Sequence, residues 1–371
     1  MGKWSFSLHL IGDSLQFQTF MFVVSGLIAF VLIIGYRTRL MTVLSWLLLV
    51  SLQNRNLYVL NSGDTLLMLL LFWSMFLPLG AKYSVDSVIY PQKNKEVKVL
   101  SMATFAYFAQ IAMLYWFSVA SKTGTEWWPE GSAVYYALNI DQHATAFGQF
   151  LLNFPSLLKL LTYGVFFFEI IGPILLFFPV YTSVIRTAAV FTFAFMHIGF
   201  AAGLYIGAFP FIDIVSLIPF LPTTFLDRIL PKGFLNKYKT TKNHRKSKNL
   251  EKSPVKIYHG RIISKFQKPI LAIVLIFLLM YVFLWNISAL SAGKYKIPQN
   301  LRPIGQILKI DQNWGVFAPY PMKNDGWFVI NEGSASGTIL GANLCTFNLL
   351  QGTEYFPYLT DSILFIEDDY E

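Results

Sequence analysis

Residues 155–180 read PSLLKLLTYGVFFFEIIGPILLFFPV, a run in which Lys159 and Glu169 are the only charged side chains. A helix of roughly 20 mostly apolar residues spans the hydrocarbon core of a bilayer, so this run predicts a transmembrane helix. Glu169 stands near its middle, where a carboxyl group is costly unless it faces a protein interior or a wet cavity. The segment therefore predicts a membrane span that turns a polar group toward neighbouring helices.

Similar apolar runs recur along the chain, at residues 17–36, 40–60, 65–81, 99–121, 184–207 and 269–290. Residues 209–222 are short for a span and hold three prolines, which favours a short crossing or a re-entrant segment. Hydrophobic residues make up 55% of the 371 and charged residues only 13%. This composition excludes a soluble globular domain. We expect an all-α polytopic membrane bundle of about eight transmembrane helices, in a bacterial cell (inner) membrane.

Basic residues predict the orientation, because cytoplasmic loops carry an excess of Lys and Arg. With eight spans, one side collects 20 of the 29 Lys and Arg residues, and 13 of these lie between Arg228 and Lys268. We therefore expect residues 228–268 to form a cytoplasmic loop, with both termini outside. A run this basic is also typical of nucleic-acid or acidic-lipid patches. Because the run lies between two predicted spans, we favour a solvated cytoplasmic linker that sets the orientation of the protein. No nucleic-acid partner is expected.

The predicted organisation is a helix bundle over residues 1–290 and a small outer C-terminal region over residues 291–371. The C-terminal region mixes Gly, Pro and aromatic residues with short apolar runs such as 327–330, so it is strand-prone. Cys345 is the single cysteine, which excludes an intrachain disulfide and a cysteine metal cluster. Paired-histidine metal spacings and a G-x-S-x-G elbow are absent from the sequence, so neither a metal site nor a serine hydrolase is predicted.

Six polar residues fall on six different predicted spans, all between the midplane and the outer face: Arg55, Asp64, Lys122, Glu169, His197 and Asp213. Together they predict a cavity open to the outer side. Taken singly, each also has a structural explanation. Asp64 is placed to cap a helix, and Lys122 to snorkel at the interface.

Two of these residues have further alternatives. Glu169 is able to form a structural ion pair with Arg55 or Lys159, and His197 to be a hydrogen-bonded core histidine.

Lys122 has the surroundings of a general base. It ends the predicted span 99–121 and is followed by Trp127 and Trp128. Burial against these rings disfavours the ammonium form, and a neutral amine accepts protons well.

Several short motifs carry a family resemblance: WSFSLH at 4–9, SLQNRNL at 51–57 before Gly63-Asp64, FLPLG at 76–80, MHIGF at 196–200, GAFP at 207–210 and WGVFAP at 314–319. In order and spacing they resemble the horizontally transferred transmembrane domain family. That family is similar to the membrane half of vitamin K-dependent gamma-carboxylase. The resemblance covers roughly residues 4 to 330.

The resemblance implies a chemistry for two residues. Lys122 followed by Glu126-Trp127 matches the carboxylase lysine that deprotonates vitamin K hydroquinone, and His197 lies in a segment similar to the carboxylase's His-containing helix. The implied activity is that of a carbon–carbon lyase, which carboxylates a glutamate-containing substrate. Lys122 and His197 are thus the expected catalytic residues.

The expected cofactor is reduced vitamin K or a related quinol. We expect Arg55, Asn54, Glu169 and Trp127 to line its site. The alternative is a non-catalytic membrane protein that binds a lipid or quinone or forms part of a transporter. An enzyme needs a neutral Lys122 facing the cavity, whereas binding needs only the apolar cavity.

Overall fold

The computed structural model describes residues 6–89, 101–229, 267–290, 294–323, 338–343 and 362–367. Most of the predicted basic loop, most of the predicted C-terminal region and Cys345 lie outside these residues. The longer helices are α1 (Leu15–Ile34), α2 (Thr38–Gln53), α3 (Ser62–Ser74), α5 (Met102–Ser121), α8 (Pro155–Phe177), α9 (Thr182–Gly203), α10 (Phe209–Leu217) and α13 (Gln267–Leu290).

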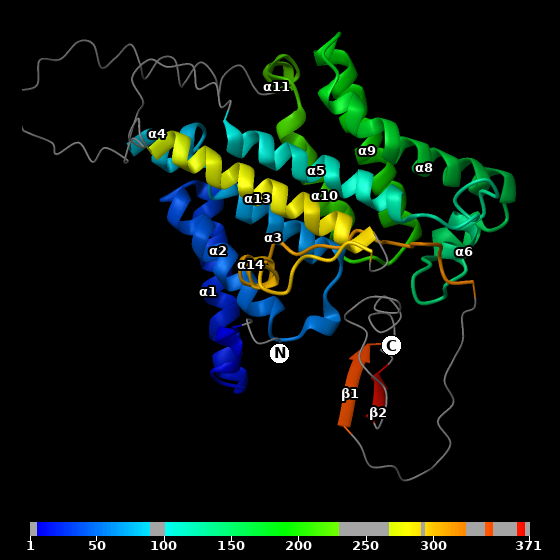
Figure 1. Cartoon of the computed structure of the whole chain (residues 1–371), viewed down its shortest axis with the longest axis horizontal. Coiled ribbons are helices and arrows are strands. Elements are labelled where there is room, and N and C mark those ends of the chain that lie inside the picture. The colour runs from blue at the N-terminus through cyan, green and yellow to red at the C-terminus, as the bar shows by residue number, and fades with distance from the viewer. Residues whose placement is uncertain are drawn as a thin grey trace, which may run out of the picture.

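Short helical segments join these helices: η1 (Leu8–Leu10), η2 (Leu57–Val59), η3 (Leu79–Ala81), α4 (Val85–Ile89), α6 (Ala133–Leu138), α7 (Ala146–Leu151), η4 (Ile218–Phe220), α11 (Thr223–Ile229) and α14 (Arg302–Leu308). Two strands, β1 (Thr338–Asn343) and β2 (Ser362–Glu367), pair in parallel with Thr338 opposite Ser362. The described part of the chain is therefore mostly helical (Figure 1).

Five of the described helices are long and apolar enough to cross a membrane: α1, α5, α8, α9 and α13. Three more, α2, α3 and α10 with η4, are apolar but shorter. The prediction of a helical membrane protein is confirmed, because the described residues include five helices that can cross a membrane. The count of eight spans stays a prediction.

The predicted spans 40–60 and 65–81 are longer than the helices that form there. The chain between the end of α2 and the start of α3 is not α-helical, and α3 begins at a capped N-terminus. The Asn61 side chain accepts hydrogen bonds from the Gly63 and Asp64 amides, and the Asp64 carboxylate accepts one from the Asn61 amide at 2.9 Å. This capping box fixes the start of α3 at Ser62.

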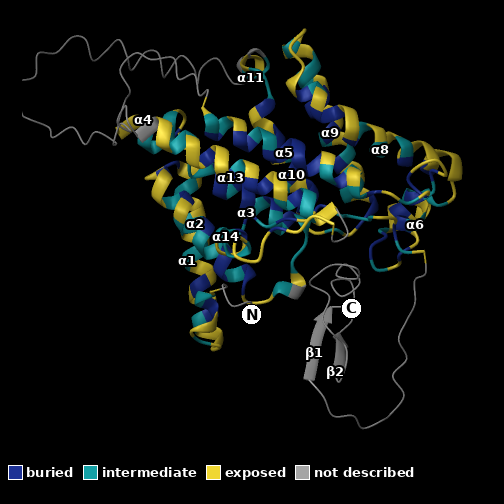
Figure 2. Ribbon diagram, viewed as in Figure 1, coloured by how far each residue is buried: buried dark blue, intermediate teal, exposed yellow. Residues whose placement is uncertain are grey.

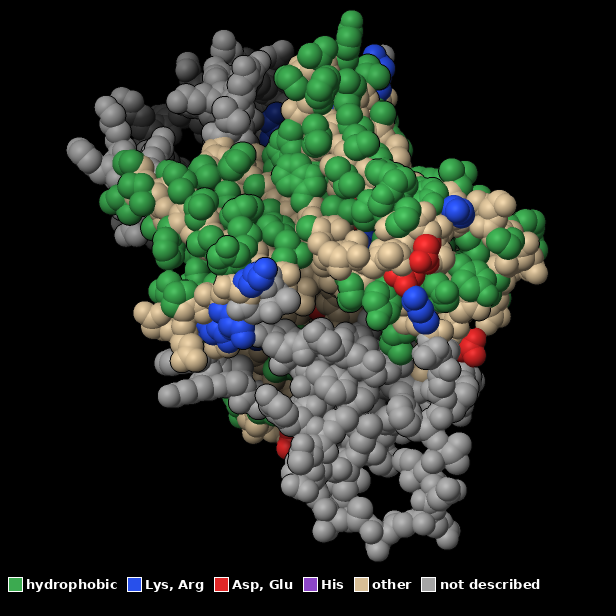
Figure 3. Space-filling view, turned by 45° about the vertical axis from the view of Figure 1, so that its right-hand side comes forward, with side chains coloured by type: hydrophobic (Ala, Val, Ile, Leu, Met, Phe, Trp, Pro, Cys, Tyr) green, Lys and Arg blue, Asp and Glu red, His purple; other side chains and the backbone are tan. Residues whose placement is uncertain are grey.

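Large apolar side chains cover the outside of the bundle, as expected for contact with lipid. Leu15, Ile33 and Phe195 are each more than three-quarters exposed, and Figure 2 shows exposed residues along α1, α8 and α9. One face carries a broad hydrophobic area with most of its charged side chains along the lower border (Figure 3). Such a surface belongs in a bilayer rather than in water.

Helix α5 is the most buried of the five long helices. It packs on α13, α8 and α3, and α13 runs alongside it (Figure 1). Helix α9 packs on α8 and α10, and α10 packs on α3. Polar groups on α5 therefore meet partners from several helices.

A segment after α14 turns back into the bundle; we call residues 310–323 the returning segment. Ile310 and Trp314 are buried in the core. Gln312 accepts a hydrogen bond from Gln110 of α5 at 2.7 Å and another from the Trp314 indole at 2.7 Å. The side-chain oxygen Oε1 of Gln110 in turn accepts one from the Trp73 indole of α3 at 3.3 Å. These bonds attach the returning segment to α5 and α3.

Replacing Gln312 with Ala should destabilise the protein by about 1–3 kcal/mol, because it leaves buried donors of Gln110 and Trp314 without their acceptor. Thermal unfolding in detergent measures this, with Ala at the exposed Asn300 as the control. Equal midpoints for the two variants would contradict the described anchoring.

Candidate functional site

Lys122 and Glu169 form a buried ion pair between α5 and α8. Lys122 Nζ lies 2.5 Å from Glu169 Oε2, and the two side chains are only 4% and 6% exposed. Lys122 is the C-cap of α5 and directly follows its last helical residue, Ser121. The Trp127 ring lies beneath its amine, with the ring centroid 4.5 Å from Nζ, in cation–π geometry. The amine, carboxyl and indole groups thus share one buried site.

The returning segment holds the loop that carries Trp127. The Trp127 indole donates to the Phe317 carbonyl at 3.1 Å, and the Gly124 amide donates to the Pro319 carbonyl at 3.0 Å. Gly124 allows this approach, since a Cβ there would lie 2.4 Å from the Glu126 carboxylate and 3.0 Å from the Pro319 carbonyl oxygen.

Glu126 of the same loop forms an ion pair with Lys323, the last residue of the returning segment. Burial alone would raise the pKa of the Glu126 carboxyl, but the hydrogen bond from Lys323 holds it below its ordinary value. Oε2 of Glu126 is buried and has no hydrogen-bond partner among the described residues. The loop therefore presents an unsatisfied acceptor close to the backbone of Gly124.

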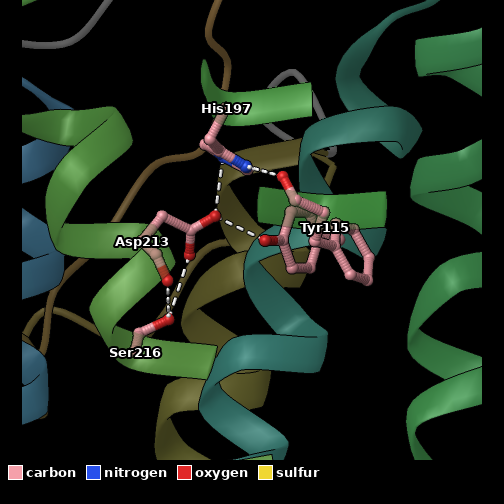
Figure 4. Close-up of polar contacts among 5 residues, drawn as sticks. Tyr115, His197, Asp213 and Ser216 are labelled. Carbon is pink, nitrogen blue, oxygen red and sulfur yellow. Dashed lines mark hydrogen bonds and ion pairs between the residues drawn. The ribbon is translucent and has the colours of Figure 1, made fainter. Parts of the chain in front are cut away.

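A second buried cluster joins α5, α9 and α10 (Figure 4). His197 Nε2 lies 2.6 Å from Asp213 Oδ2, and the Tyr115 hydroxyl donates to the same oxygen. Ser216 donates to the other carboxylate oxygen at 3.1 Å. His197 Nδ1 lies 2.9 Å from the Phe193 carbonyl, which only accepts, so Nδ1 carries a hydrogen. The contact between Nε2 and Asp213 then holds one shared proton.

Local backbone geometry brings His197 and Asp213 together. Helix α9 ends at Gly203, and the chain reverses through Gly207, which has a φ of +63° that glycine adopts without strain. Helix α10 then packs back on α9. On its other side α10 approaches α3 closely, because Gly63 has no Cβ to meet Phe209.

Arg55 and Asn54 lie elsewhere, at the C-terminal end of α2. Arg55 donates from Nη1 to the Gln18 side chain at 2.7 Å, and the Asn54 amide donates to the Phe6 carbonyl at 2.8 Å. Gln18 also contacts His9 Nδ1 at 2.8 Å. Arg55 lines a pocket of about 330 Å³ between α2 and α3.

The structure thus distributes the six predicted site residues over three places. Lys122, Glu169 and Trp127 meet at one, and His197 lies in the Asp213 cluster. Arg55 and Asn54 lie together at the end of α2.

Glu169 pairs with Lys122, so the alternatives that paired it with Arg55 or Lys159 are wrong; Lys159 instead lies over the Tyr163 ring, 5.8 Å from its centroid.

Sequence reasoning missed Tyr115, Ser216 and Gln18. Tyr115 stands seven residues before Lys122, a spacing that places both on the same helix face, and this signal was present. It was masked by the abundance of aromatic residues, 17% of the chain. Ser216 and Gln18 carry no pattern that separates them from ordinary polar residues.

The C-terminal part of the chain is similar to a different protein class. Residues 336–371 match the LD-carboxypeptidase C-terminal domain. Over 51 residues the chain is 65% identical to the putative carboxypeptidase YocD of Bacillus subtilis (strain 168), covering 14% of this chain and 15% of that protein. Over 45 residues it is 56% identical to a putative carboxypeptidase of Treponema pallidum (strain Nichols), covering 12% and 13%.

A third relative is matched over a longer stretch. The uncharacterized protein YitO of Bacillus subtilis (strain 168) is 28% identical over 139 residues, which is 36% of this chain and 44% of that protein. The chain therefore spans less than half the length of each of these curated relatives. No solved structure matches it.

The helix bundle has a family match of its own. Residues 8–225 match the HTTM domain, the transmembrane domain family found in vitamin K-dependent gamma-carboxylase. This stretch includes Lys122, Glu169, His197 and Asp213, and it covers more than half of the chain. The chain belongs to the HTTM domain family.

Proposed function

We propose that this protein is a carboxylase-like, quinol-dependent membrane enzyme in which Lys122 is the base. The observation that carries the proposal is the buried pair of Lys122 and Glu169 against Trp127, in a family that is found in vitamin K-dependent gamma-carboxylase. A membrane anchor has no need of a buried lysine and carboxylate at a helix end.

The residues around Lys122 fit a hydroquinone. Trp127 offers an aromatic face, the Lys122 amine offers a proton acceptor, and the unpartnered Glu126 Oε2 offers a buried acceptor for a hydroxyl group. Reduced vitamin K, when bound, would supply an acidic phenolic hydroxyl and, through its oxidation by molecular oxygen, a strong base for a glutamate-containing substrate. Lys122, Trp127 and Glu126 would hold this group, with Glu169 behind the amine.

Glu169 fixes the position of the proposed base, because its Oε2 lies 2.5 Å from Lys122 Nζ. The amine acts as a base in its neutral form, in which the Nζ lone pair takes up a proton to form a new N–H bond.

His197 has a supporting role in this proposal. Both of its ring nitrogens are engaged, one by the Phe193 carbonyl and the other by Asp213. It is therefore placed to fix α9 against α10 and to hold the shared proton, rather than to contact a substrate.

The finer topology is part of the same proposal. The counted Lys and Arg favour a cytoplasmic loop at 228–268 and an outer C-terminal region. A bacterial inner membrane is the proposed location. In this orientation Lys122 lies near the outer surface. A glutamate-containing substrate would then reach it from outside.

Purified protein with reduced vitamin K and oxygen tests the proposal directly. We expect oxygen-dependent formation of quinone epoxide, and incorporation of labelled carbon dioxide when a glutamate-containing peptide is added. Heat-inactivated protein is the control. Stoichiometric quinol binding without epoxide would instead support the alternative of a non-catalytic quinone-binding protein.

Exchanging Lys122 for Arg or Ala should abolish quinol oxygenation in both cases, whereas Trp127 and Glu126 should retain part of the quinol binding. Arginine keeps the positive charge, but its pKa is too high for it to act as a base. Turnover is measured at matched expression, with Lys159→Ala as the control, because the Lys159 amine lies over the Tyr163 ring and is not the partner of Glu169. Activity in Lys122→Arg close to that of the unmodified protein would show a purely electrostatic role.

Replacing Glu169 with Leu should destabilise the protein by about 3–5 kcal/mol, because the Lys122 ammonium is then buried without a partner. The double variant Lys122→Met, Glu169→Leu removes both charges and should recover most of this loss. Chemical unfolding in detergent micelles gives the free energies. An unchanged stability in the single variant would mean that the pair is solvated.

A further inference from the structure

The pocket at the end of α2 carries two opposite charges on an apolar wall. Its lining includes Arg55, Asp64 and Gln53 together with apolar residues of α2 and of the segment before α3. Its volume of about 330 Å³ falls in the range of small-molecule sites, about 300–1,000 Å³. The Gln53 side chain donates to the Asp64 carbonyl at 3.0 Å, which joins the α2 and α3 walls. The pocket is therefore built by packed elements rather than by a loose surface groove.

Arg55 is held in place by contacts behind it. Nη1 donates to Gln18 Oε1 at 2.7 Å, and the Gln18 amide donates to the carbonyls of His9 and Gly12 at 2.8 and 2.6 Å. The Arg55 side chain itself is exposed. A guanidinium has five N–H donors, so an arginine fixed through one nitrogen can still bind a phosphate with the others.

Asp64 supplies the opposite charge in the same pocket. Its Oδ2 accepts from the Asn61 amide at 2.9 Å at the start of α3. A carboxylate has a second oxygen and further lone pairs, so this bond does not exhaust its capacity as an acceptor. An ammonium group near Asp64 would be stabilised by charge and by hydrogen bonding.

The remaining wall is apolar: Leu49, Leu52, Val59 and Leu60 line it, and Val59 is half exposed. We propose that this pocket binds a phospholipid with a phosphoethanolamine headgroup, its phosphate on Arg55, its ammonium on Asp64 and the start of its acyl chain along the leucines. This site goes beyond the proposed enzyme function and does not depend on it.

Two other common phospholipids, phosphatidylglycerol and phosphatidylcholine, should bind this pocket more weakly, because each satisfies only part of its charges and donors. Phosphatidylglycerol offers the phosphate but leaves Asp64 without a cation. Phosphatidylcholine offers a cation, but its quaternary ammonium has no N–H to donate to Asp64. The pocket should therefore rank phosphatidylethanolamine first.

Native mass spectrometry of the full chain in detergent, with added short-chain lipids, tests the proposal. The unmodified protein should retain phosphatidylethanolamine over phosphatidylglycerol and phosphatidylcholine. Arg55→Gln should lower the affinity for phosphatidylethanolamine by about tenfold or more, the loss expected for a hydrogen bond to a charged group. Arg37→Gln is the matched control, because Arg37 lies at the opposite end of α2 over the Tyr36 ring.

Asp64→Asn gives the second measurement. Asparagine retains an oxygen that can accept from the Asn61 amide, so the start of α3 is preserved. The variant should still bind phospholipid but lose the preference for phosphatidylethanolamine over phosphatidylglycerol. If it folds and keeps that preference, the assignment of the ammonium to Asp64 is overturned.

Two further results would overturn the site as a whole. One is equal retention of all three lipids by the unmodified protein. The other is retention by Arg55→Gln equal to that by Arg37→Gln. If Arg55→Gln fails to fold, Arg55→Lys keeps the charge with fewer donors, and it should bind more weakly than the unmodified protein.

Discussion

Charged side chains inside this bundle are stable only because each meets a partner from another helix. An isolated ion in hydrocarbon is expensive, and the expense falls when opposite charges or hydrogen-bond donors lie within contact distance. Lys122 meets Glu169 across α5 and α8, and Asp213 meets His197 and Tyr115 across α10, α9 and α5. The positions of these helices are therefore tied to the pairing of their polar groups.

The sequence predicted the helical membrane class and the approximate positions of the long helices, because apolar runs of span length are a strong signal. It predicted the lengths of α2 and α3 poorly. Apolar residues such as Leu57 and Leu60 continue the hydropathy signal through a segment whose backbone is set by the Asn61 capping box. A hydropathy pattern carries no information about the hydrogen bonds of a helix cap, so it does not predict where such a helix begins.

The site was predicted in part, for a similar reason. Intramembrane charge marked Lys122, Glu169 and His197 as candidates, but single residues do not reveal their partners. Glu169 has Lys122 as its partner because α5 and α8 are neighbours in space, which a hydropathy pattern does not encode. The two matched families add a further boundary that composition alone did not show: the bundle match ends at residue 225, and the carboxypeptidase match begins at residue 336.

Helix α5 carries one member of each polar cluster, Tyr115 and Lys122. Seven residues at about 1.5 Å each separate them by roughly 10 Å along a single rigid rod. Inserting or deleting one residue between them would turn one side chain by about 100° relative to the other. Both clusters would then no longer form together. The length of the stretch from Tyr115 to Lys122 is therefore constrained, because the pitch of this one helix sets how the two polar clusters lie relative to each other.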